Sequence, residues 1–185
     1  NEGFATAGGV QYVACAGNFK DAGLEYTGAL KVLQMIFSYE YLWIQIRVKG
    51  GAYGCMCSFS DQGDSMFVTY RDPNLAESYK VDYVADFDAD DRDMKKYIIG
   101  TIGSMDMPME AVDMGARSFH AYFLGKTESD LQKVRDQVLS CTQEDIRALA
   151  PIVKAVVEAG NRCCIGNEEK IDQNKEYFDE VKHVL

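Results

Sequence analysis

Histidine is almost missing from this chain, which holds only His120 and His183 among its 185 residues. Metal-dependent catalysis usually draws on imidazole or thiolate ligands held close together. These two histidines lie far apart in the sequence, and neither has a cysteine or second histidine at ligand spacing. We therefore expect no metal ligands in this chain and a structural place for both histidines.

Basic residues and long apolar runs are also in short supply. The chain has 19 Lys+Arg against 29 Asp+Glu, a formal net charge of −10. Nucleic acids and anionic membranes attract clustered basic side chains, so neither is expected as a partner. No apolar run approaches the length of a membrane span, and no signal-peptide pattern opens the chain. A hydrophobic fraction of 47% is still ample for one packed core, and residues 1–185 are predicted to form a single domain.

The six cysteines are interpreted as reduced thiols of the core. Cys55 and Cys57 lie in one strand-like run and Cys163 and Cys164 in another, and neither pair has the C-x-x-C spacing of common structural zinc sites. Adjacent residues of a strand face opposite ways, which separates Cys163 from Cys164. Reduced thiols favour the cytoplasm or an organelle lumen. Disulfides, a metal cluster and a self-sufficient thiol protein built on Cys55 and Cys57 remain alternatives.

Hydrophobic periodicity predicts an α+β fold. Short apolar runs between turn residues predict strands over 8–16, 52–60, 65–71 and 162–166, the middle two forming a hairpin. Helical spacing of apolar residues predicts a long helix over 27–46, further helices beginning near 72, 90, 108, 127 and 142, and a short helix in the tail. The helix near 72 would carry Leu75, Tyr79 and Tyr83 on one face. Strands segregated from a run of helices favour an antiparallel or mixed sheet with helices packed on one face.

Common catalytic and ligand-binding motifs are missing. The acidic run over 86–93 has neither the glycine nor the final glutamate of an EF-hand loop, and acids there complement a helix N-terminus. The pairs Gly8-Gly9 and Gly50-Gly51 match neither a phosphate-binding loop nor a dinucleotide fingerprint, and no G-x-S-x-G elbow occurs. The sequence therefore carries no self-contained catalytic motif of these kinds.

The segment IRVKGGAYG over residues 46–54 is the strongest candidate for a functional site. The predicted helix delivers Arg47 near its C-terminal end, Gly50 and Gly51 break it, and Tyr53 begins a strand. Arg47 supplies forked donors of fixed charge, and the Tyr53 phenol can donate to a developing oxyanion. A structural interpretation also stands, because a C-terminal arginine complements the helix dipole and two glycines make a turn.

The stretches SYEYLWIQIRVKGGAYG, TYRDPNL, KKYIIGTIGSMDMP and RCCIGNEEKI together cover most of the chain. In this order they resemble the C-terminal region of presequence-protease-like peptidases, of the pitrilysin/insulinase family of zinc metallopeptidases. The resemblance implies four homologous α+β domains in two halves that close around a peptide in a chamber. It implies a zinc site in the first domain, built on an inverted H-x-x-E-H motif that this chain lacks. The chain, which begins at Asn1, is therefore expected to be the C-terminal, non-zinc domain of a larger hydrolase, inactive alone.

The resemblance also implies roles for particular residues. Arg47 and Tyr53 match the arginine and tyrosine that the C-terminal half lends to the catalytic chamber, where they contact the peptide backbone and stabilise the tetrahedral intermediate. Gly50, Gly51 and Ala52 would hold their spacing beside the substrate. The expected partners are a peptide and the sibling domains, and the expected cofactor is a zinc ion bound by another domain. The alternative is a catalytically inactive partner subunit with the same fold.

Overall fold

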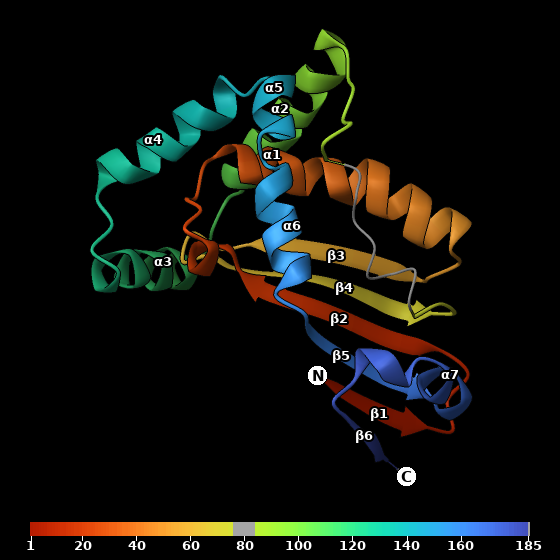
Figure 1. Cartoon of the computed structure of the whole chain (residues 1–185). Coiled ribbons are helices and arrows are strands. Elements are labelled where there is room, and N and C mark those ends of the chain that lie inside the picture. Colours follow the sequence, from red (N-terminus) through yellow and green to blue (C-terminus); the bar gives the residue numbers. More distant parts are fainter. Residues whose placement is uncertain (76–83, 185) are drawn as a thin grey trace.

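Six strands form one mixed sheet in the computed structural model, which describes residues 1–75 and 84–184 (Figure 1). The strand order is β3-β4-β2-β5-β1-β6, with β1 parallel to its neighbours β5 and β6 and the other pairs antiparallel. The bounds are β1 (Glu2–Thr6), β2 (Gln11–Asn18), β3 (Gly54–Phe59), β4 (Asp64–Asp72), β5 (Asn161–Asn167) and β6 (Glu180–His183). The predicted α+β class and the β3–β4 hairpin are confirmed.

The helices follow the N-terminal signals that the sequence carries. Asp90 caps α2 through its side chain, and Thr127 and Thr142 form capping boxes that start α4 and α5. The bounds are α1 (Ala29–Ile36), η2 (Phe37–Lys49), α2 (Asp91–Met105), α3 (Ala111–Phe123), α4 (Glu128–Leu139), α5 (Gln143–Arg147), α6 (Ala150–Glu158) and α7 (Glu168–Gln173), with short turns η1 (Phe19–Ala22) and η4 (Lys175–Tyr177). No helix within the described residues is both long enough and apolar enough to cross a membrane.

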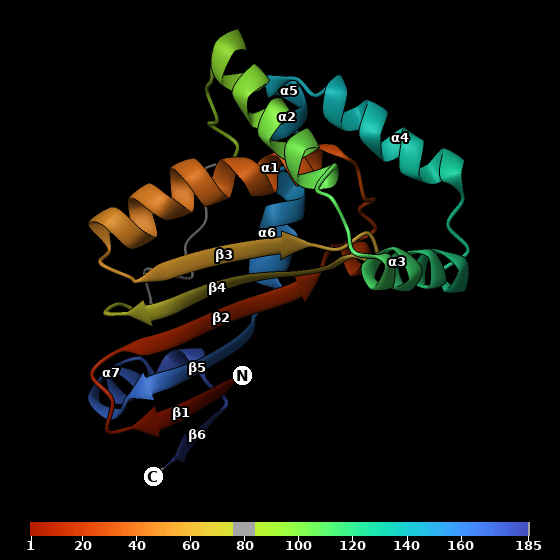
Figure 2. The ribbon, with the colours of Figure 1, turned by 180° about the vertical axis from the view of Figure 1, so that it is seen from behind.

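Helices cover one face of the sheet and leave the other face open. Val13 and Cys15 of β2 point into the core with Phe67 of β4, whereas the neighbouring Tyr12 is 38% exposed. The core side chains interlock across the layers, with the Phe37 ring of η2 centred 5.8 Å from that of Phe67. Figures 1 and 2 show α6 and α7 on the same side of the sheet, so the helical layer is one-sided as predicted.

The long predicted helix is continuous but consists of an α-helical and a π-helical segment. Residues 29–36 are α-helical and 37–49 continue as a π-helix, whose wider spacing is seen where the Gly50 N–H donates to the Gln45 carbonyl at 2.9 Å. The periodicity of apolar residues does not distinguish an α-helix from a π-helix here, since both segments bury side chains in the core. The helix consequently ends at Lys49, three residues beyond the predicted end.

Several predicted boundaries were wrong. The strand over 2–6 and the closing strand over 180–183 were missed, because each is short and gains its stability by pairing within the sheet. The helix predicted from 108 begins at Ala111, and the helix predicted from 142 divides into α5 and α6 ahead of Pro151. Asp72 ends β4 instead of opening a helix, and the predicted positions of Tyr79 and Tyr83 lie outside the described residues.

Candidate functional site

A two-glycine turn connects η2 to β3. The Gly51 N–H donates to the Arg47 carbonyl at 3.0 Å, and Gly51 has a φ of +81°, which favours glycine. A Cβ on Gly50 would stand 2.5 Å from the Ile46 carbonyl oxygen, a backbone atom that cannot move aside alone. Local geometry therefore favours glycine at both positions: a side chain at Gly50 would clash with the backbone, and Gly51 has a positive φ.

The TYRDPNL segment buttresses this turn from the end of β4. The Asn74 side-chain amide donates to the Gly50 carbonyl at 2.7 Å. The Tyr53 N–H donates to the Tyr70 carbonyl at 3.1 Å, which ties the start of β3 to β4. Pro73 lies 3.3 Å from the place where a Gly51 Cβ would stand. The two sequence stretches therefore occur together because they form one structural unit.

Arg47 and Tyr53 converge on this unit, as the sequence predicted. The Arg47 guanidinium carbon lies 3.9 Å from the centre of the Trp43 ring and 5.9 Å from the centre of the Tyr53 ring. Tyr53 is 64% exposed, so its phenol is open to a ligand, whereas Ala52 is buried and anchors the turn in the core. The structure thus brings the two predicted polar residues together on either side of the turn that contains Gly50, Gly51 and Ala52.

Three further residues belong to the same cluster and were not predicted. The Arg71 guanidinium carbon lies 5.9 Å from the Tyr53 ring centre and 5.7 Å from the Tyr70 ring centre. The Tyr70 ring makes edge contacts with Tyr53 at 5.7 Å and with Tyr12 at 5.2 Å between centroids. Strict alternation along β4 would point Arg71 into the core, so a prediction from alternating burial does not place it in an exposed cluster. The remaining signal was its place in the TYRDPNL motif.

The cluster is electropositive within an acidic chain. Interaction with the Tyr12 phenol and the nearby Tyr70 raises the pKa of Arg71, so its guanidinium keeps its charge. Guanidinium and phenol groups are hydrogen-bond donors suited to carbonyl oxygens and carboxylates. The cluster is therefore chemically suited to a ligand that carries a carbonyl or carboxylate oxygen.

The described residues of this chain do not fit a zinc site. His120 is exposed on α3, and the His183 Nδ1 lies 3.2 Å from a Glu168 carboxylate oxygen. No group of three His, Cys, Asp or Glu side chains suited to a metal ion occurs within residues 1–75 and 84–184. In the acidic run, Asp90 caps α2 and Asp88 pairs with Arg147 at 3.5 Å, which supports the structural interpretation of these acids.

Burial protects every thiol except that of Cys163 at least in part. Burial raises the pKa of Cys57, Cys141 and Cys164 to about 12 and raises those of the other three above the usual thiol range. Cys163 and Cys164 face opposite sides of β5 as predicted, which leaves Cys163 exposed and corrects the expectation that all the thiols lie in the core. A reactive centre on Cys55 and Cys57 is disfavoured, because the main influence on both thiols is burial, which opposes formation of the thiolate.

We predict slow alkylation of the folded chain by iodoacetamide at neutral pH, with Cys163 modified first and Cys57, Cys141 and Cys164 last. The order follows from exposure and from the small thiolate fraction of a thiol with a raised pKa. Peptide mass spectrometry over time, with a urea-unfolded sample as the fully reactive reference, measures it. Preferential labelling of Cys55 and Cys57 in the folded chain would instead revive the thiol-protein hypothesis.

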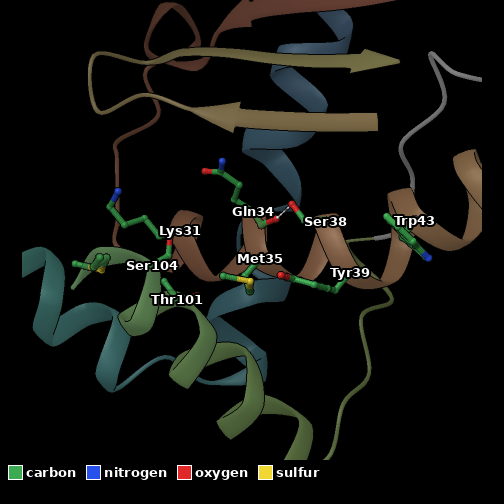
Figure 3. A pocket seen from close by; sticks show the side chains of 9 residues that line it. Lys31, Gln34, Met35, Ser38, Tyr39, Trp43, Thr101 and Ser104 are labelled. Carbon is green, nitrogen blue, oxygen red and sulfur yellow. Dashed lines mark hydrogen bonds between the residues drawn. The ribbon is translucent and has the colours of Figure 1, made fainter. Parts of the chain in front are cut away.

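A hollow in the described surface lies mostly outside the cluster. It is a groove of about 680 Å³ between α1–η2 and α2, and Figure 3 shows Met35 and Tyr39 on the side that faces Thr101. Burial lowers the pKa of Lys31 at its far end. The groove is lined by Lys31, Gln34, Met35, Ser38, Tyr39, Trp43, Thr101, Ser104 and Met105. Its lining shares only Trp43 with the cluster and includes no carboxylate, histidine or cysteine, so the cluster is the better candidate site.

Comparison with protein-family models identifies the family of this chain. The sequence model described as the PreP C-terminal domain matches residues 1–167. The chain is 42% identical over 190 residues to "Protein HypA" of Clostridium perfringens, and 32% identical over 194 residues to "Presequence protease 1, chloroplastic/mitochondrial" of Arabidopsis thaliana. Both alignments cover 100% of this chain but only 20% and 18% of the relatives, so the chain spans about a fifth of their length.

Solved structures show the same fold at low sequence identity. A protease from Helicobacter pylori superposes with a TM-score of 0.62 and 14% identity, covering 89% of this chain and 43% of that one. An inactive peptidase domain from Bordetella parapertussis superposes with a TM-score of 0.61 and 14% identity, covering 87% and 91% of the two chains. The six-stranded sheet with one helical layer is therefore an arrangement shared with peptidase domains.

Proposed function

The chain belongs to the PreP C-terminal domain family, and from this premise we propose that it binds substrate and assists catalysis in a zinc-dependent oligopeptidase that hydrolyses unfolded peptides in a closed chamber. The single observation that carries the proposal is the convergence of Arg47 and Tyr53 on a turn that their neighbours hold rigid. Relatives named presequence proteases support the peptidase class. The chloroplastic or mitochondrial location in those names supports an organelle lumen, with the cytoplasm as the other reducing location.

In this proposal Arg47 and Tyr53 bind the carbonyl group of the peptide bond that is cut. The guanidinium N–H and the phenol O–H donate to the carbonyl oxygen, and both hydrogen bonds strengthen as that oxygen gains negative charge in the tetrahedral intermediate. Trp43 stacks against the Arg47 guanidinium and holds it in place, at 3.9 Å. The zinc ion, bound by another domain of the longer polypeptide, supplies the activated water when present.

The open face of the sheet supports a peptide as the ligand. Apolar side chains project from it beside the cluster and are between 38% and 53% exposed: Tyr12, Met56, Met66, Tyr70 and Ile165. Methionine and aromatic side chains adapt to varied apolar partners, which suits the binding of unfolded peptides of different sequence. This surface adjoins the Arg47–Tyr53 pair, so a peptide lying across it would reach the polar residues.

An apolar stripe on α3 supports contact with sibling domains. None of the residues of α3 is buried, and Val112, Phe119, Tyr122 and Phe123 are each more than two-thirds exposed. Phe119 and Phe123 stack on one another at 6.2 Å on one side of the helix, which stands apart from the sheet (Figure 1). Since the relatives are about five times longer than this chain, we propose that a neighbouring domain of the same polypeptide covers the stripe.

The test compares residues 1–185 alone with the full-length polypeptide that contains them. We expect the isolated chain to cleave no peptide and to bind no stoichiometric zinc, and the longer polypeptide to do both, because this chain lacks H-x-x-E-H and its described residues hold no clustered metal ligands. Hydrolysis of an unfolded fluorogenic peptide and metal analysis measure the two properties. A longer polypeptide that contains zinc-binding residues but cleaves no peptide would contradict the proposal. A parent gene without H-x-x-E-H would favour the inactive partner subunit.

A further inference from the structure

Arg71 owes its position to an irregularity between two strands. Gln11 of β2 pairs with Asp72, and Val13 pairs with Thr69, so Tyr12 faces both Tyr70 and Arg71 across a β-bulge. Arg71 has a φ of +49° and is the only residue other than glycine with a positive φ among residues 1–75 and 84–184. Such conformations are retained where the surrounding structure enforces them, often at binding sites.

The bulge changes the direction in which Arg71 points. Successive strand residues normally face opposite sides, so Arg71 would be expected on the buried face next to an exposed Tyr70. Here Tyr70 and Arg71 are both exposed, and Asp72 is the residue that returns to the core. The bulge therefore adds a second guanidinium to the open face, where it lies near the ring of Tyr53 on which Arg47 also converges.

Arg71 has no carboxylate partner in the described part of the chain. Elsewhere the fold uses arginines structurally, as in the two bonds of 2.6 and 2.7 Å from Arg135 to Asp106. Neither Arg47 nor Arg71 makes such a salt bridge to a described acid, although the chain carries 29 acids. An exposed guanidinium that lies among phenol rings and pairs with no acid of residues 1–75 and 84–184 is suited to binding the carboxylate of a ligand.

We propose that Arg71 binds a carboxylate of the peptide substrate, either its C-terminal carboxylate or an Asp or Glu side chain. The proposal rests on the proposed function in taking a peptide as the ligand, and it adds a preference for peptides that carry such a group. Arg47 and Tyr53 bind the backbone carbonyl, while the planar fork of Arg71 pairs with two carboxylate oxygens and the phenol of Tyr12 or Tyr53 lies beside the pair. Arg71 thereby selects substrates and has no part in bond cleavage.

Binding to the full-length polypeptide in the presence of EDTA tests this without requiring hydrolysis. Three fluorescent versions of one peptide are compared: one with a free C-terminal carboxylate, one amidated with a single internal Glu, and one amidated with Gln in its place. We expect Arg71→Gln to raise the Kd about 10-fold for at least one carboxylate-bearing version and to leave the neutral version unchanged, the scale of a charged hydrogen bond. The version affected identifies the source of the carboxylate.

Two further variants separate this role from folding. Arg71→Gly removes the guanidinium while suiting the positive φ, so it should weaken the same peptide as Arg71→Gln does. Lys49→Gln removes an equal charge from the nearby end of η2 and should change the Kd of the three versions little. Equal weakening of all three versions by Arg71→Gln, or weakening of none, overturns the proposal. Failure of the proposed function is recognised separately, by the absence of hydrolysis when EDTA is omitted.

Discussion

Replacing Arg47 by Ala or Tyr53 by Phe in the full-length enzyme is expected to lower kcat by about 10²-fold each, the scale of losing one donor to an oxyanion. Both changes remove a hydrogen bond that is strongest when the carbonyl oxygen becomes negative, so kcat should fall more than KM rises. The measurement is steady-state hydrolysis of an unfolded peptide with saturating and limiting substrate. The double variant should lose less than the product of the single losses, because both groups bind one oxygen.

Matched controls come from the same helix. Tyr39→Phe removes an equally exposed phenol from η2, and Lys49→Ala removes a positive charge near its end, but neither residue belongs to the cluster. Both controls should keep kcat near that of the parent enzyme. Arg47 and Tyr53 variants with undiminished kcat would remove these residues from the mechanism, while the peptidase class of the whole protein would then rest on its family alone.

The second large effect is expected from Gly50→Ala. The added methyl group would stand 2.5 Å from the Ile46 carbonyl oxygen, so the end of η2 must shift and carry Arg47 away from Tyr53. We expect a loss of stability of about 1–3 kcal/mol, typical of overpacking, and a fall in kcat/KM of about 10²-fold, since displacements near 1 Å can cost that much. Urea unfolding and peptide hydrolysis measure the two effects.

Gly54→Ala is the control for this prediction. A Cβ at Gly54, four residues after Gly50, would meet its nearest neighbour, the Tyr70 Cβ, at 3.9 Å, which is ordinary contact. The variant should keep its stability and activity close to those of the parent protein. If both alanine variants behave alike, the tight approach at Gly50 has no functional consequence and the turn is not what positions Arg47.

Much of this site was predictable because its determinants are local. Arg47 and Tyr53 are six residues apart, and a helix broken by Gly50 and Gly51 has few ways to proceed. Capping boxes at Thr127 and Thr142 likewise act within three residues of the side chain concerned. Interactions of this kind involve residues close together in the sequence, so the spacing of residue types was enough to predict the turn, the main helix starts and the candidate pair.

Other features depend on contacts between distant residues. The short strands over 2–6 and 180–183 come from opposite ends of the chain and pair with each other, and the strand over 2–6 also pairs with β5; neither has a strong pattern of its own. Asn74 reaches back to Gly50 across 24 residues. Arg71 joins the cluster only because β2 and β4 pair with a bulge, a property of two strands that neither sequence segment expresses alone.

The sequence by itself determined the α+β class, the hairpin, the one-sided helical layer and the proximity of Arg47 to Tyr53, because periodicity, caps and turn residues are local properties of the chain. Tertiary structure alone decided the π-helical winding before the turn, the order of the sheet and the place of Arg71 among the phenols. These depend on strand register and on packing between segments far apart, where the energies of many contacts select one arrangement.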